Sequence, residues 1–204
     1  LESYRVYDET GEKAAIYTHI GPKNKGGIIL SGHSDVVPVE GQEWETDPFK
    51  LTEKEDKFYG RGACDMKGFI ACALSAVPDM VEADLQKPIQ IAISYDEEVG
   101  CLGAPHMIKD MQKNIPPADL VIVGEPTMMK VVNSHKGISL LETDIRGFEV
   151  HSSLVNKGVS AVMTAAKLIN WLEVEMKKNS DNSKNHSNPL AAPFNPPYTT
   201  LHVG

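Results

Sequence analysis

Cysteine is scarce in this 204-residue chain, and long apolar runs are missing from it. The three cysteines, Cys64, Cys72 and Cys101, are odd in number and form no C-x-x-C pair, which argues against a disulfide scaffold and predicts reduced thiols in a cytoplasm. No apolar run approaches the roughly 18 residues of a membrane span, and the N-terminus lacks a basic-then-apolar signal pattern. We therefore expect a cytoplasmic protein with no membrane partner.

Positive charge is also in short supply. Twenty lysines and arginines stand against 28 aspartates and glutamates, which gives a formal net charge of −8. No basic stripe is interleaved with aromatic residues, so nucleic acid is not an expected partner. With 41% apolar and 24% charged residues, the composition is typical of a globular protein of one large or two small domains.

Three short apolar runs alternate with two helical patterns along the first part of the chain. The runs GGIIL (26–30), PIQIAISY (88–95) and ADLVIVG (118–124) are rich in Ile and Val and predict strands buried on both faces. Apolar residues recur at helical spacing over 66–83 and 101–113. This order predicts an α/β fold with a mostly parallel sheet flanked by helices.

The pattern changes at residue 137, so we expect a partial first domain over 1–136 and a smaller α+β domain over 137–204. Residues 138–153 alternate like a half-exposed strand, and residues 158–178 predict an amphipathic helix. Residues 179–197 are polar and proline-rich, which predicts a loop.

Each predicted strand is followed by residues that can bind a metal. The first leads into His33 and Asp35, the second into Asp96, Glu97 and Glu98, and the third into Glu125. Because ligands bind beyond the carboxyl ends of strands in open α/β sheets, we expect one shared site. His33 and Asp35 are two residues apart, so they face the same side and the carboxylate can orient the imidazole.

Local sequence adds detail to this predicted site. Asp65 follows a glycine-bracketed turn and is either a metal ligand on a tight loop or a helix N-cap. Glu97 and Glu98 point to opposite sides, so one can bind a metal while the other faces a bound water; the alternative is a solvated acidic turn. Pro126 keeps Glu125 out of helical geometry at the end of its strand.

His33, Asp65, Glu98 and Glu125 together offer one imidazole and three carboxylates, a set that suits zinc, cobalt or manganese. Two divalent ions about 3.5–4 Å apart need about three ligands each, so this set is short of a ligand. The other histidines lie at no obvious strand end of the first domain: His19, His106, His135, His151, His186 and His202. The chain begins without Met and ends on the strand-like YTTLHVG. We therefore interpret it as a fragment whose missing ligand lies beyond Gly204.

Four motifs, in this order and spacing, resemble those of the di-zinc amidohydrolases that include acetylornithine deacetylase, succinyl-diaminopimelate desuccinylase and aminoacylase. They are GHSDVVPVEGQEWETDPF, YGRGACDMKG, DEEVGCLGA and GEPT, and the match runs from about residue 27 to about residue 165. The resemblance implies a zinc-peptidase-like catalytic domain. It also implies two zinc ions per complete subunit, with cobalt as an alternative.

The resemblance implies these metal ligands: His33 and Glu125 on one zinc, Glu98 on the other, and Asp65 between them. It makes Glu97 the general base and Asp35 the residue that orients His33. The family also uses a final histidine near the end of its catalytic domain, a region that this chain does not contain.

The second domain resembles the family's lid and dimerisation domain, which implies a homodimer. RGFEVHSSLVNKGVSAV matches a stretch whose histidine, here His151, helps to stabilise the tetrahedral oxyanion, in some members from the partner subunit. Val150 departs from the pattern, because many relatives have a glycine before that histidine. A plain surface role for His151 stays open.

The stretches VPVEGQEWETDPF and EVGCLGA are most similar to those of the acetylornithine deacetylases. This implies a zinc-dependent enzyme that removes the acetyl group from N-acetyl-L-ornithine, a small N-acyl amino acid substrate, in arginine biosynthesis. A desuccinylase, dipeptidase or aminoacylase of the same family is an alternative, as is a non-catalytic metal-binding or dimerisation module. Against that module, a structural zinc site has no use for Glu97 beside a ligand glutamate. A serine hydrolase built on GHSDV is not expected, because Val36 stands where a nucleophile elbow needs glycine.

Overall fold

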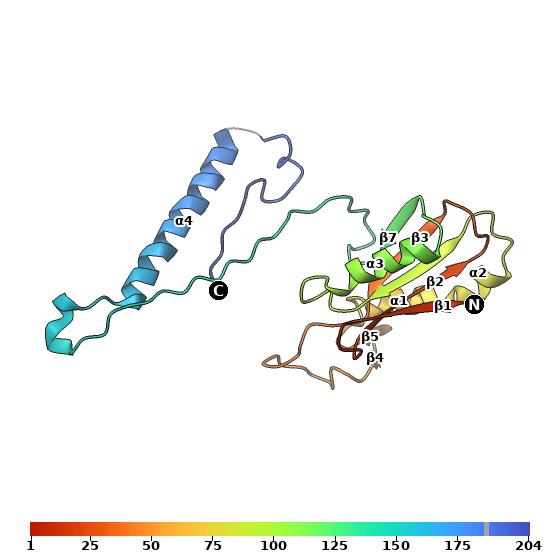
Figure 1. Cartoon of the computed structure of the whole chain (residues 1–204), viewed down its shortest axis with the longest axis horizontal. Coiled ribbons are helices and arrows are strands. Elements are labelled where there is room, and N and C mark those ends of the chain that lie inside the picture. The colour runs from red at the N-terminus through yellow and green to blue at the C-terminus, as the bar shows by residue number, and fades with distance from the viewer. Residues whose placement is uncertain (186–187) are drawn as a thin grey trace. The chain divides into compact units, whose positions relative to one another are not determined.

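The computed structural model describes residues 1–185 and 188–204, and the chain divides into two compact units, 1–130 and 131–204 (Figure 1). The sequence placed this boundary slightly later, between residues 136 and 137. His186, one of the histidines considered above, lies outside the described residues. None of the described helices is long and apolar enough to cross a membrane.

A five-stranded sheet with the order β1-β2-β6-β3-β7 forms the centre of the first unit. Its strands are β1 (Ser3–Tyr7), β2 (Ala14–Ile20), β3 (Ile28–His33), β6 (Ile89–Ser94) and β7 (Leu120–Val123). β3 pairs in parallel with β6 and with β7, whereas β2 is antiparallel to both β1 and β6. Every strand except β2 therefore runs in the same direction, which confirms the predicted mostly parallel sheet.

The sequence did not predict four of the strands, which are β1, β2 and the hairpin of β4 (Thr52–Lys54) and β5 (Lys57–Tyr59). β1 alternates between exposed and half-buried residues and therefore contains no continuous apolar run. Its pairing with β2 is fixed by a cross-strand aromatic contact, because the rings of Tyr4 and Tyr17 stack with their centroids 4.8 Å apart.

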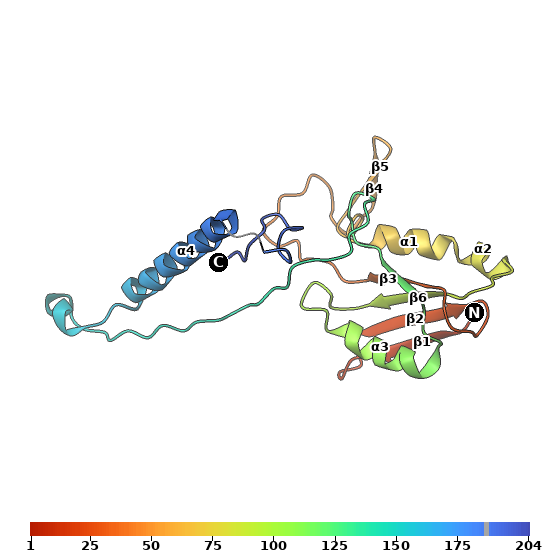
Figure 2. The same cartoon turned by 90° about the horizontal axis from the view of Figure 1, so that it is seen from above.

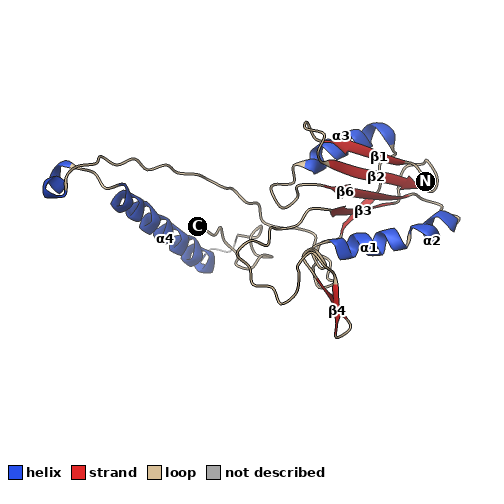
Figure 3. Cartoon of the chain, turned by 90° about the horizontal axis from the view of Figure 1, so that it is seen from below, coloured by secondary structure: helices blue, strands red, loops and turns tan. Residues whose placement is uncertain are grey.

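Helices cover both faces of the sheet. α1 (Lys67–Ser75) and α2 (Val77–Glu82) lie on one face, and α3 (Gly103–Asn114) lies on the other (Figures 2 and 3). The sequence predicted one helix over 66–83, but the structure divides it at Ala76. The reason is Pro78, which has no N–H to donate to the carbonyl one turn earlier.

The hydrophobic core lies between α3 and the sheet. Its buried members are Ala15, Tyr17, Ala92, Tyr95, Met107 and Met111. The Tyr17 hydroxyl donates a hydrogen bond to Asp110 Oδ2 at 2.7 Å and accepts one from Asn114 Nδ2 at 2.8 Å. The buried phenol is thus satisfied by two residues of α3, which joins β2 to that helix.

The far edge of the sheet is much less covered. All four residues of β7 are exposed, although each is a large aliphatic residue. Beside β7, an apolar groove of about 440 Å³ lies between α3 and the sheet, lined by residues such as Ile29, Met107 and Val121.

The second unit contains the 3-10 helix η1 (Ser152–Lys157) and the long helix α4 (Ala161–Asn185). The predicted helix over 158–178 is confirmed, but it continues through polar residues that the sequence assigned to a loop. Local contacts support this last part, since the Ser183 hydroxyl bonds to the Ser180 carbonyl at 2.7 Å and Lys184 pairs with Asp181 at 3.1 Å.

The strand expected over 138–153 does not form in the described residues. That segment contributes only an isolated bridge between Phe148 and Val159. A strand needs neighbours to satisfy its backbone groups and to bury one of its faces, and the described part of this unit offers no other strand. The β component of the expected α+β domain is therefore limited to this bridge.

Candidate metal centre

Three parallel strands bring the predicted ligands to one edge of the sheet. β3 lies between β6 and β7, with His33 opposite Ser94 of β6 and Ser31 opposite Val123 of β7. The turn that carries Glu97 and Glu98 follows β6, and Glu125 follows β7, so these groups meet beyond the carboxyl ends of the strands. This is the edge at which the sequence predicted a shared site.

His33 is the buried centre of this cluster, with 2% of the residue exposed. Its Nδ1–H donates to the main-chain carbonyl of Asp35 at 3.1 Å. Because a carbonyl oxygen can only accept, the proton of a neutral ring lies on Nδ1 and the lone pair lies on Nε2. The buried histidine therefore presents a ligand atom to the space beyond the sheet.

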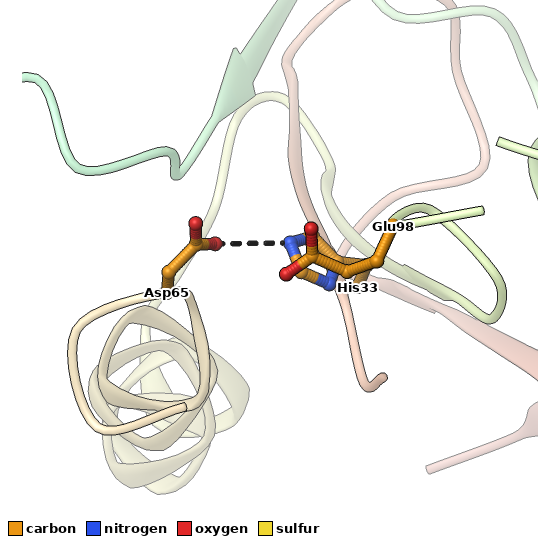
Figure 4. A group of neighbouring side chains, drawn as sticks. All are labelled: His33, Asp65 and Glu98. Atoms are coloured by element: carbon orange, nitrogen blue, oxygen red, sulfur yellow. Dashed lines mark hydrogen bonds and ion pairs between the residues drawn. The ribbon is translucent and has the colours of Figure 1, made fainter. Parts of the chain in front are cut away.

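Carboxylate oxygens surround that nitrogen. Asp65 Oδ1 lies 3.1 Å from His33 Nε2, Glu125 Oε1 lies 3.7 Å away and Glu97 Oε2 lies 3.8 Å away. His33, Asp65 and Glu98 each offer a ligand atom within 4.8 Å of the others, and Figure 4 shows the Asp65 carboxylate directed at the imidazole. The structure thus brings the four predicted ligands and Glu97 together.

The pKa values in the cluster reflect crowded negative charge. Burial, followed by the charge of Asp65, raises the pKa of Glu98 and of Glu125. Burial alone would lower the pKa of His33, but the Asp35 carbonyl and the surrounding carboxylates outweigh it and raise that pKa. Each shift shows that the site favours added positive charge.

A divalent cation fits this arrangement. A neutral imidazole aims its Nε2 lone pair at carboxylate oxygens that also carry only lone pairs, and this arrangement is stabilised only if a cation lies between them. Either a proton on Nε2 or a metal ion can supply this positive charge. One imidazole nitrogen among carboxylate oxygens is a ligand set for zinc, cobalt or manganese, as the sequence predicted.

Asp65 does not cap the helix that follows it. The N-cap of α1 is Met66, and its side chain makes no capping hydrogen bond. The Asp65 carboxylate faces His33 instead. Of the two interpretations of Asp65, helix N-cap and site residue, the geometry favours the site residue.

Asp35 contacts His33 differently from the expected arrangement. Its main-chain carbonyl, rather than its carboxylate, accepts the Nδ1 proton, and the carboxylate Oδ1 lies 3.5 Å from Nδ1. The other oxygen, Oδ2, accepts the backbone N–H of Glu98 at 3.0 Å. Burial would raise the pKa of Asp35, but the backbone N–H groups of Glu98 and Glu97 outweigh it and lower that pKa. Asp35 therefore holds both the imidazole and the turn after β6.

Two further residues near this turn, Asp96 and Cys101, make contacts that affect its charge. Asp96 forms an ion pair with Lys13 Nζ at 2.7 Å, so its charge is already matched. The Cys101 thiol donates a weak hydrogen bond to Glu97 Oε1 at 3.6 Å. Burial and the charge of Glu97 raise the pKa of Cys101, which keeps the thiol protonated and able to donate.

His151 belongs to the second unit and is held by local contacts. It precedes η1, and its Nδ1 accepts the backbone N–H of Ser153 at 3.2 Å and lies 2.9 Å from the Ser153 hydroxyl. Val150, which departs from the family pattern, packs its Cγ2 against Gly158. His151 is exposed, and its role in catalysis stays a prediction.

Sequence reasoning missed one residue that contacts the ligand segments. Lys67 lies two residues after Asp65, and its Nζ donates to the main-chain carbonyl of Ser34, between His33 and Asp35. The available signal was its place in DMKG, directly after the predicted ligand.

Comparison with known proteins places these features in a family. Residues 29–196 match the model of peptidase family M20/M25/M40. Acetylornithine deacetylase of Pasteurella multocida (strain Pm70) is 39% identical over 182 residues, 89% of this chain and 45% of that protein. Acetylornithine deacetylase of Myxococcus xanthus is 36% identical over 210 residues, 100% of this chain and 51% of that protein. The chain thus spans about half the length of these curated relatives.

A solved structure shows the same relationship. The crystal structure of an M20 family metallo-carboxypeptidase from Sulfolobus solfataricus aligns with a TM-score of 0.50 and 27% sequence identity. The alignment covers 59% of this chain and 28% of that protein. The chain therefore shares an M20 architecture as well as sequence.

Proposed function

This chain belongs to peptidase family M20/M25/M40, and from that premise we propose that the whole protein is a metal-dependent amide hydrolase that deacetylates N-acetyl-L-ornithine. The choice of substrate rests on two relatives, both acetylornithine deacetylases, at 39% and 36% identity. The products would be ornithine and acetate, and the reaction would be a step of arginine biosynthesis.

One observation carries the proposal of metal-dependent chemistry. The Nε2 atom of buried His33 lies among the carboxylates of Asp65, Glu98 and Glu125, with Glu97 beside them. A structural site would need only the ligands. A further carboxylate next to them, with its side chain 37% exposed, is what hydrolysis of an amide requires.

We assign roles within this cluster. His33 and Glu125 would bind one zinc or cobalt ion, Glu98 would bind the other, and Asp65 would bridge them, with a last histidine supplied from outside this chain. Two bound divalent ions would polarise the substrate carbonyl and make a coordinated water more acidic.

Glu97 would act as the general base. Its Oε2 lies at the edge of the ligand cluster, and its Oε1 is oriented by the Cys101 thiol. The carboxylate would accept a proton from the attacking water and pass it to the departing amine, a transfer that contributes about 10²- to 10⁴-fold in rate. Asp35 would keep His33 and the Glu97–Glu98 turn in place through its two hydrogen bonds.

The second unit completes the proposal. It would form part of the lid and dimerisation domain of a cytoplasmic homodimer, and His151 would donate a hydrogen bond to the developing oxyanion. Its Nδ1 is engaged by Ser153, which leaves Nε2 as the donor in the neutral ring.

The test is ornithine release from N-acetyl-L-ornithine by the full-length protein, with and without added zinc. N-succinyl-diaminopimelate and a dipeptide are assayed in parallel. Zinc-dependent release from the acetyl substrate alone is the expected result. Turnover of only one of the other substrates would support metal-dependent hydrolysis but contradict the proposed substrate. A zinc-loaded protein that cleaves none of them would support the non-catalytic alternative.

Glu97→Gln tests the general base directly. The variant should retain its metal content, because Glu97 is not one of the assigned ligands, and should lose about 10²- to 10⁴-fold in turnover. Glu82→Gln, on the exposed surface of α2, is the matched control and should retain full activity. Wild-type turnover in a metal-replete Glu97→Gln protein would remove Glu97 from the mechanism.

A further inference from the structure

We infer that Lys67 is a positioning residue for the metal centre, which it organises by tying the Asp65 loop to the His33 segment; the inference rests on the proposed function of that centre. Lys67 is the first residue of α1, two residues after Asp65. Its Nζ donates to the carbonyl of Ser34, the residue between His33 and Asp35. A single side chain therefore joins two segments that carry ligands and lie 32 residues apart.

Ser34 extends this connection to the third ligand segment. Its backbone N–H donates to the carbonyl of Ser94 at 2.9 Å, and its hydroxyl donates to the same oxygen at 3.1 Å. Ser94 ends β6, just before the turn that carries Glu97 and Glu98. The Lys67 ammonium thus anchors a residue that fixes the segment after β3 to the end of β6, next to the contact of Asp35 with the Glu98 N–H.

The path of the lysine stem is defined by packing. Gly62 has φ +80°, and a Cβ added there would lie 3.2 Å from Lys67 Cε and 2.7 Å from Val36 Cγ1. The absence of a side chain at Gly62 leaves room for the stem to pass over the loop. The backbone N–H of Lys67 also donates to the Gly62 carbonyl at 2.8 Å, so Lys67 is held to the loop at its backbone and to Ser34 at its ammonium.

The target of the ammonium matters for metal binding. Lys13 pairs with a carboxylate, Asp96, and so removes that group from further use. Within the described residues, Lys67 forms no ion pair with Asp65, Glu97 or another carboxylate, and its ammonium donates to a neutral carbonyl. It can therefore position two ligands without competing with a metal for either of them.

The experiment measures zinc affinity of the full-length protein by competition with a chromophoric chelator. K67M keeps the stem length and removes the donor, K67R keeps a donor, and K109M changes an exposed lysine of α3 as the matched control. K67M should bind zinc about 10- to 100-fold more weakly, the loss found when an outer partner of a metal ligand is removed. K67R and K109M should stay within about threefold of wild type.

Two further readouts separate positioning from general stability. The thermal melting curve of metal-free K67M should match that of K109M, and its kcat at saturating zinc should return close to that of wild type. Wild-type zinc affinity in K67M would overturn the inference. If K67M does not fold, a tenfold or greater loss in K67R, which retains the donor, would overturn it instead (about tenfold is the lower bound expected for a lost outer partner).

The outcomes also separate this inference from the proposed function. A wild-type protein that binds zinc without cleaving any of the three substrates overturns the proposed activity, while a loss of affinity in K67M still supports the positioning role. A wild-type protein that binds no zinc overturns both.

Discussion

The two units hold their side chains in opposite ways. Every buried hydrophobic residue of the described chain lies in the first unit, where Met66 is 0% and Tyr17 is 1% exposed. In the second unit no described residue is buried, and large apolar side chains such as Met163 and Trp171 are 66% and 55% exposed. The first unit is organised by a core. The described part of the second unit is held by hydrogen bonds instead, both within α4 and between distant residues such as Lys136 and Tyr198.

The difference explains how each candidate site residue is positioned. Met66 packs against Gly32, where an added Cβ would lie only 3.0 Å from the Met66 Cε. This contact presses the start of α1 onto β3, directly beside both Asp65 and His33. His151, by contrast, is held by Ser153 two residues away. Burial therefore fixes His33 in the candidate metal centre, whereas sequence-local contacts fix His151.

The largest contrast should appear in metal binding by the full-length protein. His33→Ala removes the proposed central ligand, so zinc affinity should fall by more than about 100-fold, which exceeds the loss from an outer partner alone. His151→Ala should leave the affinity unchanged and lower kcat. Isothermal titration with zinc measures the affinity of both variants, and ornithine release measures kcat. An equal loss of affinity in the two variants would contradict the expected difference between the units.

Methionine truncation compares the interiors of the two units. Met66→Ala should reduce the free energy of unfolding by about 2–5 kcal/mol, because the side chain is fully buried. Met163→Ala should change it by less than about 0.5 kcal/mol, because that side chain is largely exposed. Urea denaturation measures both values. Similar losses would mean that α4 packs in solution as tightly as α1.

High pH should weaken the first unit through its buried phenol. Burial and the hydrogen bond to Asp110 raise the pKa of Tyr17 from 10.0 to about 12. The neutral form is thus favoured in the folded state, so its contribution is complete below pH 10 and is lost as pH rises through about 12. The full loss is about 3 kcal/mol for a difference of about two pH units between the two pKa values.

Tyr17→Phe tests this effect, since it removes the group that titrates. Urea denaturation between pH 9 and pH 11.5 should show a shallower decline in unfolding free energy for the variant than for wild type (about 1.4 kcal/mol per pH unit at most for one group). Parallel declines in the two proteins would assign the alkaline loss to other groups.

The smallest effect should come from the surface of α4. Lys178 pairs with Glu175 at 2.6 Å, but the side chains are 60% and 30% exposed. Lys178→Ala should therefore cost only about 0.2–0.5 kcal/mol. Circular dichroism should show nearly the same helicity for Lys178→Ala and for wild type, at low and at high salt. A loss above about 1 kcal/mol would show that this pair lies in a packed environment.

Much of the first unit was predictable because its parallel strands have a simple signature. The strands β3, β6 and β7 each contain a short run rich in Ile, Leu or Val, and a residue that can bind a metal lies at or just beyond the end of each strand. β1 lacks such a run, since only its alternate residues are half-buried, and β2 was missed although its residues 14–17 are apolar. The end of α4 was assigned to a loop because Ser, Asn and Asp are weak helix formers.

Within the site, residue types were easier to predict than contacts. The sequence identified His33, Asp35 and Asp65 as neighbours, but not which oxygen of Asp35 would contact the imidazole, because carbonyl direction depends on how the chain turns after β3. The contact between Lys67 and Ser34 could not be predicted either, since Lys67 bonds to a backbone carbonyl, a group that every residue possesses.

Among the described residues, β7 is the last strand of the sheet, and this position bears on how the 204-residue chain behaves in solution. Leu120, Val121, Ile122 and Val123 are 41–58% exposed, and an edge strand with this composition is a template on which strands of other molecules can add. Strand addition of this kind begins above a critical concentration, as polymerisation does. The net charge of −8 raises that concentration because the chains repel one another. Salt, which screens charge, should therefore promote self-association of this chain through β7 well before it affects the buried core.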